Sequence, residues 1–177
     1  MDFSSEEPWE YTIGTEEGSI INGVLQGSLN IEKEEVSIAT MAPVTSVSNH
    51  PNKDTDLILV SSVDWTVKIH QKSTQKNLVT FDSYDDYVYD AKWNPNIHSL
   101  FACSDGDGNL DIWDVGKNLE SPYARLQTSS KSLNKIAWDC NGTKIAAGNS
   151  VSAVYIYQLD KDYSHPKGDD WMKNLLY

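Results

Sequence analysis

Short runs of alternating apolar and polar residues recur along this chain at a nearly constant interval. Four such runs occupy residues 14–23, 61–70, 104–113 and 149–157. Their last residues are 47, 43 and 44 positions apart, and they are Gly23, His70, Trp113 and Tyr157. Alternation with a period of two predicts a β-strand with one buried face. The apolar positions that carry it in the last three runs are Val67, Ile69, Leu110, Ile112, Val154 and Ile156.

A second set of apolar positions precedes each run and repeats at the same interval. Val44, Val88 and Leu133 are followed three residues later by Val47, Ala91 and Ile136. A further strand of small and apolar residues is predicted between these positions and the final run, at residues 57–62, 100–104 and 144–148. A repeat of roughly 40–45 residues with several short strands is typical of the blades of a WD-type β-propeller. The predicted fold is therefore all-β, with WD40-type blades.

The repeats divide the chain into an acidic segment, about three and a half blades and a tail. We expect the acidic N-terminal segment at residues 1–12, a partial first blade at 13–40, and further blades at 41–82, 83–128 and 129–160, followed by a C-terminal tail at 161–177 that could form a short helix. This number of blades gives an incomplete ring, with exposed apolar faces and strand edges. We therefore expect either a fragment or truncated product, or a chain that another chain completes.

The charge of the chain argues against several classes of partner. The formal net charge is −12, and residues 1–35 hold nine acidic residues against the single Lys33. Nucleic acids and anionic lipid headgroups require clusters of Lys and Arg, so neither is an expected partner. The longest aliphatic run, at residues 57–60, is far too short to cross a bilayer, and we expect no membrane association. The acidic segment serves either solubility or the docking of a basic partner.

One segment has the spacing of a calcium-binding loop. Asp105, Asp107 and Asn109 stand at its first, third and fifth positions. The loop also requires Gly at the sixth position and a carboxylate at the twelfth, where this chain has Leu110 and Gly116. We interpret the segment as a β-turn between two strands, and Asp64 holds the equivalent place in the preceding repeat.

The sequence offers no constellation typical of an enzyme, and we expect no catalytic residues, cofactor, metal or small-molecule substrate. The four histidines, His50, His70, His98 and His165, have no spacing that would bring them together. His70 occupies the repeat position of Trp113, so we expect its ring to pack between blades. Cys103 and Cys140 lack a CxxC motif and are expected to be reduced thiols.

Two loops are predicted to emerge at the same rim of the propeller. One contains Asp64 and Trp65, and the other contains Tyr84, Asp85, Asp86 and Tyr87. Aromatic rings surrounded by polar groups are typical of binding hot spots, so we expect this rim to bind a basic or amphipathic partner. Alternatively, Trp65 folds under its own blade and Tyr87 belongs to a seam between blades. The expected structural signature of the blades comprises Asp64, Val67, Asp107, Leu110, Trp113, Val154 and Tyr157.

Several segments together resemble one family more closely than they resemble generic WD repeats. They are SSVDWTVKIH at residues 61–70, DDYVYDAKWNP at 85–95, SLFACSDGDGNLDIWDV at 99–115 and SLNKIAWDCNGTKIAAGNSVSAVYIY at 132–157. In this order and spacing they resemble the C-terminal propeller of cytoplasmic dynein intermediate chains. The resemblance implies a non-catalytic subunit in the cytoplasm, associated with the cytoskeleton. Its partner would be the tail of the dynein heavy chain, and its role would be microtubule-based transport.

The chain also departs from that family. The family's N-terminal segments form a coiled coil for dynactin and carry the light-chain motifs, and the residues before Glu6 match neither. Binding of light chains and dynactin is therefore not expected of this chain. Ciliary relatives share part of the motifs, so the sequence leaves the choice between cytoplasmic and ciliary dynein open. The alternative function is a WD40 scaffold or adaptor of an unrelated multiprotein complex.

Overall fold

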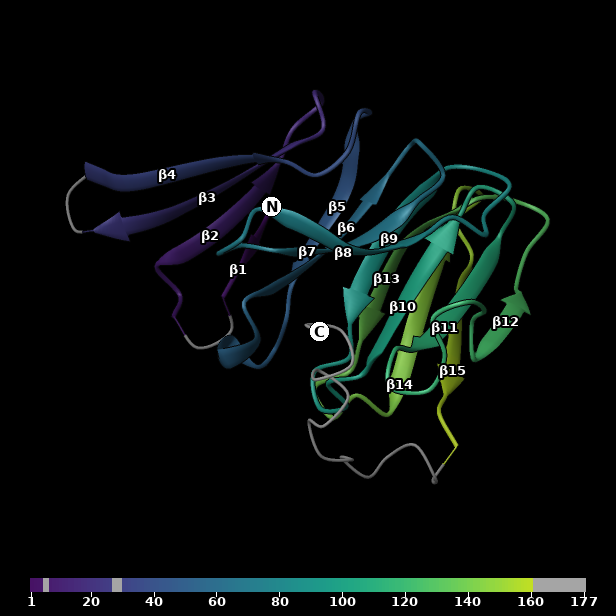
Figure 1. Cartoon of the computed structure of the whole chain (residues 1–177). Helices are drawn as coiled ribbons and strands as arrows, with labels where there is room; N and C mark the ends of the chain where they lie inside the picture. The colour runs from purple at the N-terminus through teal and green to yellow at the C-terminus, as the bar shows by residue number, and fades with distance from the viewer. Residues whose placement is uncertain (5–6, 27–29, 161–177) are drawn as a thin grey trace.

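The computed structural model describes residues 1–4, 7–26 and 30–160, which form four separate antiparallel β-sheets (Figure 1). Each sheet is one blade. Blade 1 contains β1 (Asp2–Phe3), β2 (Glu10–Gly14), β3 (Ser19–Gln26) and β4 (Asn30–Ile38). Blade 2 contains β5 (Val44–Asn49), β6 (Leu57–Ser62), β7 (Val67–Gln71) and β8 (Lys76–Phe81), with the short 3-10 helix η1 (Lys53–Thr55) between β5 and β6.

The other two blades follow in the same manner. Blade 3 contains β9 (Val88–Trp93), β10 (Leu100–Asp105), β11 (Asn109–Asp114) and β12 (Ala124–Gln127). Blade 4 contains β13 (Leu133–Trp138), β14 (Lys144–Asn149) and β15 (Val154–Gln158). Strands that are consecutive in sequence pair with each other in every sheet. The described residues do not close a ring, and the predicted fold, an incomplete all-β propeller, is confirmed.

The register of the strands explains the repeat in the sequence. In every blade a residue of the second strand pairs with the residue twelve positions later on the third strand, and these pairs are Tyr11 with Gly23, Ile58 with His70, Phe101 with Trp113, and Ile145 with Tyr157. The last members are the residues that mark the repeat. A shift by one residue would move every side chain to the opposite face, so this register keeps the buried face of each blade constant.

Blade 1 begins earlier than the sequence indicates. The segment at residues 1–12, expected to be an acidic extension, contributes β1 and part of β2, so the first blade has four strands rather than a partial set. Phe3 pairs with Tyr11, and Glu10 pairs with Val24. The acidic side chains do not prevent pairing: Asp2 Oδ2 accepts a hydrogen bond from Asn49 N of blade 2 at 2.8 Å, and Glu10 is half-buried. The tail at 161–177 lies outside the described residues.

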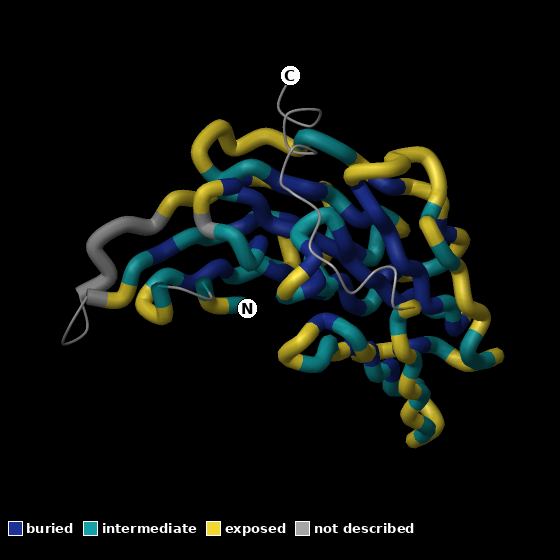
Figure 2. The backbone as a smooth tube through the Cα atoms, turned by 90° about the horizontal axis from the view of Figure 1, so that it is seen from below, coloured by how far each residue is buried: buried dark blue, intermediate teal, exposed yellow. Residues whose placement is uncertain are grey.

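Three apolar clusters lie between neighbouring blades and form the core. The cluster between blades 2 and 3 contains the rings of Phe81, Phe101 and Trp113, and the centroids of Phe81 and Trp113 are 4.6 Å apart. Side chains also bond across the seams: Ser46 Oγ donates to Ala91 O, and the backbone N–H of Ile136 donates to Asp90 Oδ2, each at 3.2 Å. In Figure 2, buried residues lie in the middle of the molecule and exposed loops lie around them.

Candidate functional site: the loop rim of the blades

The loops that join the second and third strands of a blade lie beside the linkers that enter the same blade. We call this surface the loop rim, and it comprises residues 39–43, 63–66, 82–83, 85–87 and 106–108. The same backbone hydrogen bond recurs in three blades: Val63 N donates to Pro43 O at 3.2 Å, Gly106 N to Tyr87 O at 2.9 Å, and Ser150 N to Ser132 O at 3.0 Å. The two predicted loops are therefore on one side of the molecule.

Asp64 fixes the turn that presents Trp65. Its carboxylate accepts hydrogen bonds from Thr40 Oγ1 in the adjacent linker, from Thr66 N at 3.2 Å and from Lys68 Nζ at 2.9 Å. Partial burial alone would raise the pKa of Asp64, but these hydrogen bonds and the Lys68 charge outweigh it and lower the pKa. The carboxylate is therefore ionised at neutral pH and holds the turn against the linker.

Trp65 and Tyr87 are both exposed on the loop rim. Trp65 has a φ of 65°, a backbone conformation that bulky residues rarely adopt, and 48% of its surface is exposed. The alternative in which this indole folds under its own blade does not match that exposure. Tyr87 is 45% exposed and its ring meets Tyr89 edge-on at 6.4 Å. Met41, in the neighbouring linker, is 93% exposed.

Tyr84 lies in the core and not on the loop rim where the sequence placed it. It is 5% exposed, and its hydroxyl oxygen is 2.9 Å from both Trp113 Nε1, which donates to it, and Cys103 Sγ. Burial raises the pKa of Tyr84 well above its ordinary value. Of the linker residues expected at the surface, Asp85 and Tyr87 are exposed and Asp86 is half-buried. Tyr84 is therefore not part of the loop rim.

The expected blade signature divides into core and surface positions. Val67, Leu110 and Trp113 are almost completely buried, Tyr157 packs against the cluster between blades 3 and 4, and Val154 is 68% exposed. Asp107 is exposed, and the carboxylate that closes its turn is that of Asp105. Asp105 accepts hydrogen bonds from Asn109 N and Asn109 Nδ2, both at 2.8 Å. Burial raises the pKa of Asp105 above its ordinary value.

His70 is a fully buried link between blades 1 and 2, as the sequence predicts for its ring. Its Nε2 lies 2.9 Å from Ser37 Oγ on β4, and its Nδ1 lies 2.9 Å from Asn77 Oδ1 on β8. Burial lowers the pKa of His70, with the Asn77 hydrogen bond acting in the opposite direction. This histidine therefore stabilises the contact between blades 1 and 2.

The blades of this chain are similar to those of known WD-repeat proteins. The family model described as WD domain, G-beta repeat, matches residues 36–71 and 75–114, which lie mainly in blades 2 and 3. The chain is 30% identical over 178 residues to the cytoplasmic dynein 1 intermediate chain of Drosophila melanogaster, and the match covers 98% of this chain. Over nearly its whole length the chain is therefore similar to a dynein intermediate chain. It spans 27% of the length of that relative, and its blades are consistent with the C-terminal WD portion.

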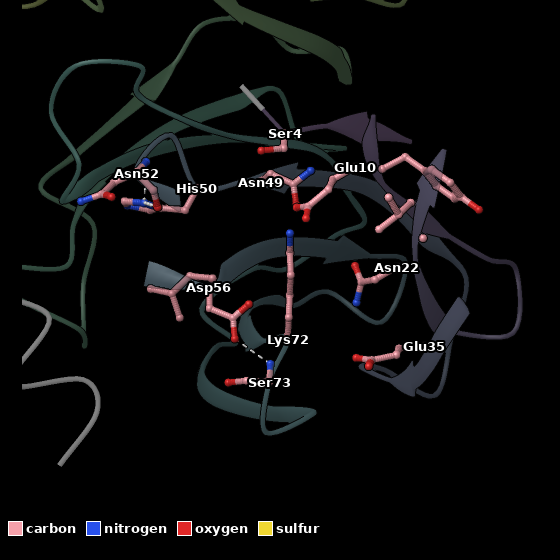
Figure 3. A pocket seen from close by; sticks show the side chains of 14 residues that line it. Ser4, Glu10, Asn22, Glu35, Asn49, His50, Asn52, Asp56, Lys72 and Ser73 are labelled. Carbon is pink, nitrogen blue, oxygen red and sulfur yellow. Dashed lines mark hydrogen bonds between the residues drawn. The ribbon is translucent and has the colours of Figure 1, made fainter. Parts of the chain in front are cut away.

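The chain also has a polar cavity that the sequence did not indicate. The cavity has a volume of about 280 Å³ and lies between blades 1 and 2 (Figure 3). Its charged lining comes from separate elements: Glu10 on β2, Glu35 on β4, Asp56 before β6 and Lys72 after β7. Asp56 Oδ2 accepts a hydrogen bond from Ser73 N at 2.7 Å. No sequence motif marks the cavity because two blades form it jointly.

Over residues 1–4, 7–26 and 30–160, no three His, Cys, Asp or Glu side chains gather in an arrangement that could hold a metal ion. None of the helices in that part is long and apolar enough to cross a bilayer.

Proposed function

We propose that the chain is a non-catalytic WD-repeat subunit of the dynein motor complex. It docks on the tail of the dynein heavy chain and contributes to microtubule-based transport, in the cytoplasm and in association with the cytoskeleton. The observation that carries the proposal is the 30% identity to a cytoplasmic dynein 1 intermediate chain along 98% of this chain. A match of that extent includes all four blades. The general WD-repeat model matches only residues 36–71 and 75–114, so generic repeats account for only part of the similarity.

The loop rim is the surface that we propose for docking. Trp65, Tyr87 and Met41 supply exposed apolar area, and the carboxylates of Asp82 and Asp85 are exposed beside them. Aromatic side chains contribute large contact areas at low cost in side-chain entropy, and polar neighbours form the rim of such an interface. This combination suits an amphipathic helix that carries basic residues. The same chemistry disfavours an acidic partner.

Cys103, Tyr84 and His70 have structural roles, which supports a non-catalytic function. The thiol of Cys103 and the hydroxyl of Tyr84 contact each other in the core, and burial raises the pKa values of both. A reactive cysteine requires a lowered pKa and access to solvent, and Cys103 has neither. His70 is likewise held between two blades.

Affinity purification from cells tests the proposal. The chain would be tagged after Tyr177 at its own locus, and copurifying proteins would be identified by mass spectrometry. We expect the dynein heavy chain among them. Trp65→Ala combined with Tyr87→Ala should remove the heavy chain and leave the expression level unchanged. Tyr123→Ala is the matched control, because this tyrosine is 53% exposed and lies between β11 and β12, away from the loop rim. Recovery of a different complex without heavy chain would contradict the proposal and support an unrelated scaffold.

A further inference from the structure

The face that blade 1 turns toward blade 2 is polar where the corresponding faces of blades 2 and 3 are apolar. Residues that pair across neighbouring strands share one face of a sheet. The paired set is Leu59, Ile69 and Val79 in blade 2 and Ala102, Ile112 and Ala124 in blade 3, whereas blade 1 has Thr12, Asn22 and Glu35. In blades 2 and 3 these residues belong to the apolar clusters between blades. The seam between blades 1 and 2 is therefore partly polar.

The polar cavity lies at this seam (Figure 3). Glu10, in its lining, stands where blades 2 and 3 have Leu57 and Leu100, which are almost fully buried. Polar groups in a seam cost free energy unless they find partners, and departures from the local pattern are expected at functional sites. The volume of about 280 Å³ is just below the range of roughly 300–1,000 Å³ for pockets that hold drug-sized ligands, so the cavity suits a single side chain.

Groups of both charges face the cavity without a partner in the described part of the chain. Lys72, which follows β7, extends into the middle of the cavity, and no described carboxylate lies within ion-pairing distance of its Nζ (Figure 3). The carboxylates of Glu10 and Glu35 likewise accept no hydrogen bond from the described residues. Asn49 Oδ1 accepts a hydrogen bond from Thr12 Oγ1 at 2.9 Å, but Asn49 Nδ2, at the cavity wall, has no acceptor among those residues.

These groups define the chemistry of a ligand. The lining contains the carboxylates of Glu10, Glu35 and Asp56 and a single lysine, so the cavity attracts a cation. The donors of Lys72 and Asn49 require an oxygen acceptor in the same ligand. An arginine residue within a peptide offers both, because its guanidinium presents several N–H donors to carboxylates and its peptide groups carry carbonyl oxygens.

We propose that the cavity binds the side chain of an arginine residue in a segment of a partner protein. The guanidinium faces the carboxylates of Glu10 and Glu35, and a peptide carbonyl oxygen of the segment faces Lys72 and Asn49. The cavity is lined by residues that follow β5 and β7, whereas the loop rim contains the loop between β6 and β7, so the two surfaces lie at opposite ends of the strands. The arginine site is thus separate from the loop rim and does not rest on docking to the dynein heavy chain.

Titration with an arginine residue blocked at both ends tests the proposal. The probe is N-acetyl-arginine N-methylamide, whose two peptide groups reproduce those of an internal residue. In two-dimensional nitrogen–proton NMR spectra of the whole chain, we expect saturable shifts of the Asn49 side-chain amide and of the backbone amide of Ser73, which lines the cavity. The matched probe is the corresponding citrulline derivative, which has a similar shape but no charge. It should bind weaker by about tenfold or more, because it lacks the charge that the carboxylates attract.

Substitution of the two glutamates tests the assignment of the site. Glu10→Gln combined with Glu35→Gln should weaken binding of the arginine probe by about tenfold or more. Glu16→Gln combined with Glu17→Gln is the matched control, because it removes the same charge from exposed positions between β2 and β3 and should leave binding unchanged. Thermal unfolding of both variants shows whether the fold is intact.

Three results would overturn the proposal: no saturable shift at Asn49 in the wild-type chain, equal binding of the arginine and citrulline probes, or full binding by the Glu10→Gln and Glu35→Gln variant. If that variant fails to fold, the comparison of the two probes on the wild-type chain decides. The heavy chain takes no part in these titrations, so their failure would leave the proposed docking through the loop rim standing.

Discussion

The indole nitrogen of Trp113 donates a hydrogen bond to the hydroxyl of Tyr84 at 2.9 Å, and this contact joins β11 of blade 3 to the linker that leaves blade 2. Both residues are almost fully buried. The contact places the exposed part of the linker, from Asp85 to Tyr87, on the loop rim. A tyrosine in an acidic linker therefore anchors the surface that we propose for docking.

Tyr84→Phe should destabilise the protein without creating a cavity. The substitution leaves Trp113 Nε1 buried without an acceptor, and a buried unsatisfied donor costs roughly 1–3 kcal/mol. Urea unfolding followed by tryptophan fluorescence would measure the loss. Tyr87→Phe is the control and should change the free energy of unfolding very little, since Tyr87 is 45% exposed. Equal stability of Tyr84→Phe and the wild type would show that the hydroxyl contributes nothing to the seam.

Arg125→Ala should destabilise blade 3 in a pH-dependent manner. The Asp111 carboxylate is 1% exposed and receives hydrogen bonds from Arg125 Nε at 2.9 Å and from Nη2 at 2.7 Å. Loss of one partner of a buried pair costs about 3–5 kcal/mol, and we expect roughly 2 kcal/mol here because Arg125 is 39% exposed to water. Lys117→Ala, which removes an exposed partner of Asp114, should cost far less.

The direction of the pH effect follows from the pKa of Asp111. Burial raises this pKa above the ordinary value of 3.8, and Arg125 opposes the shift. Without Arg125 the pKa rises further, so the folded variant binds a proton more readily than the unfolded chain does. The difference in the free energy of unfolding between the variant and the wild type should therefore shrink as the pH falls from 8 toward 5. A difference that is constant over this range would contradict the assignment.

Asp64→Asn should loosen the turn that presents Trp65. The substitution removes a charge that accepts hydrogen bonds from Thr66 and Lys68, and hydrogen bonds to charged groups contribute roughly 1.5–3 kcal/mol. Because the pKa of Asp64 is lowered in the folded state, the carboxylate stabilises the fold above pH 3.8 and loses this effect as the pH falls below that value. Denaturant titrations at pH 7 and at pH 3 should thus show a large and a small difference, respectively. Identical differences at both pH values would exclude this role.

Gly23→Ala should destabilise blade 1. A Cβ at this position would lie 2.3 Å from the hydroxyl oxygen of Tyr11 and 2.4 Å from its Cζ, and Tyr11 is only 7% exposed. Overpacking of this kind costs typically 1–3 kcal/mol. The loss should be smaller in a Tyr11→Ala background, because the ring that causes the clash is then absent. A double-mutant cycle measured by thermal unfolding would show a coupling free energy, and strict additivity would contradict the contact.

The sequence predicted the strands well because the repeat leaves a fixed mark on each blade. The predicted first strands begin at Val44, Val88 and Leu133, where β5, β9 and β13 begin in the structure. The repeat is hard to recognise in blade 1, because Gly23 stands where the other blades have an aromatic or histidine ring. The ring of Tyr11, which pairs with Gly23, lies over this glycine. Acidic residues around β1 and β2 further obscured the alternation.

The candidate site was predicted less completely than the fold. The repeat correctly predicted that Trp65 and the linker between blades 2 and 3 lie on one side of the molecule, because the order of strands determines which loops emerge at the same end of the sheets. It did not predict which rings point outward: Tyr84 lies among aspartates in the sequence, yet it meets Trp113, which is 29 residues away in the chain. The cavity beside Lys72 was not predicted for the same reason, since its lining combines residues of two blades.

Direct binding between purified components is the most stringent test of the proposal that the chain docks on the dynein heavy chain through its loop rim. The chain would be immobilised, and the purified tail of the dynein heavy chain would be titrated over it by biolayer interferometry. We predict saturable binding that Trp65→Ala with Tyr87→Ala weakens by about tenfold or more, with no change in the melting temperature. Absence of binding by a folded wild-type chain would contradict the central claim. Binding that is unaffected by the double substitution would retain the partner but exclude the loop rim as its docking surface.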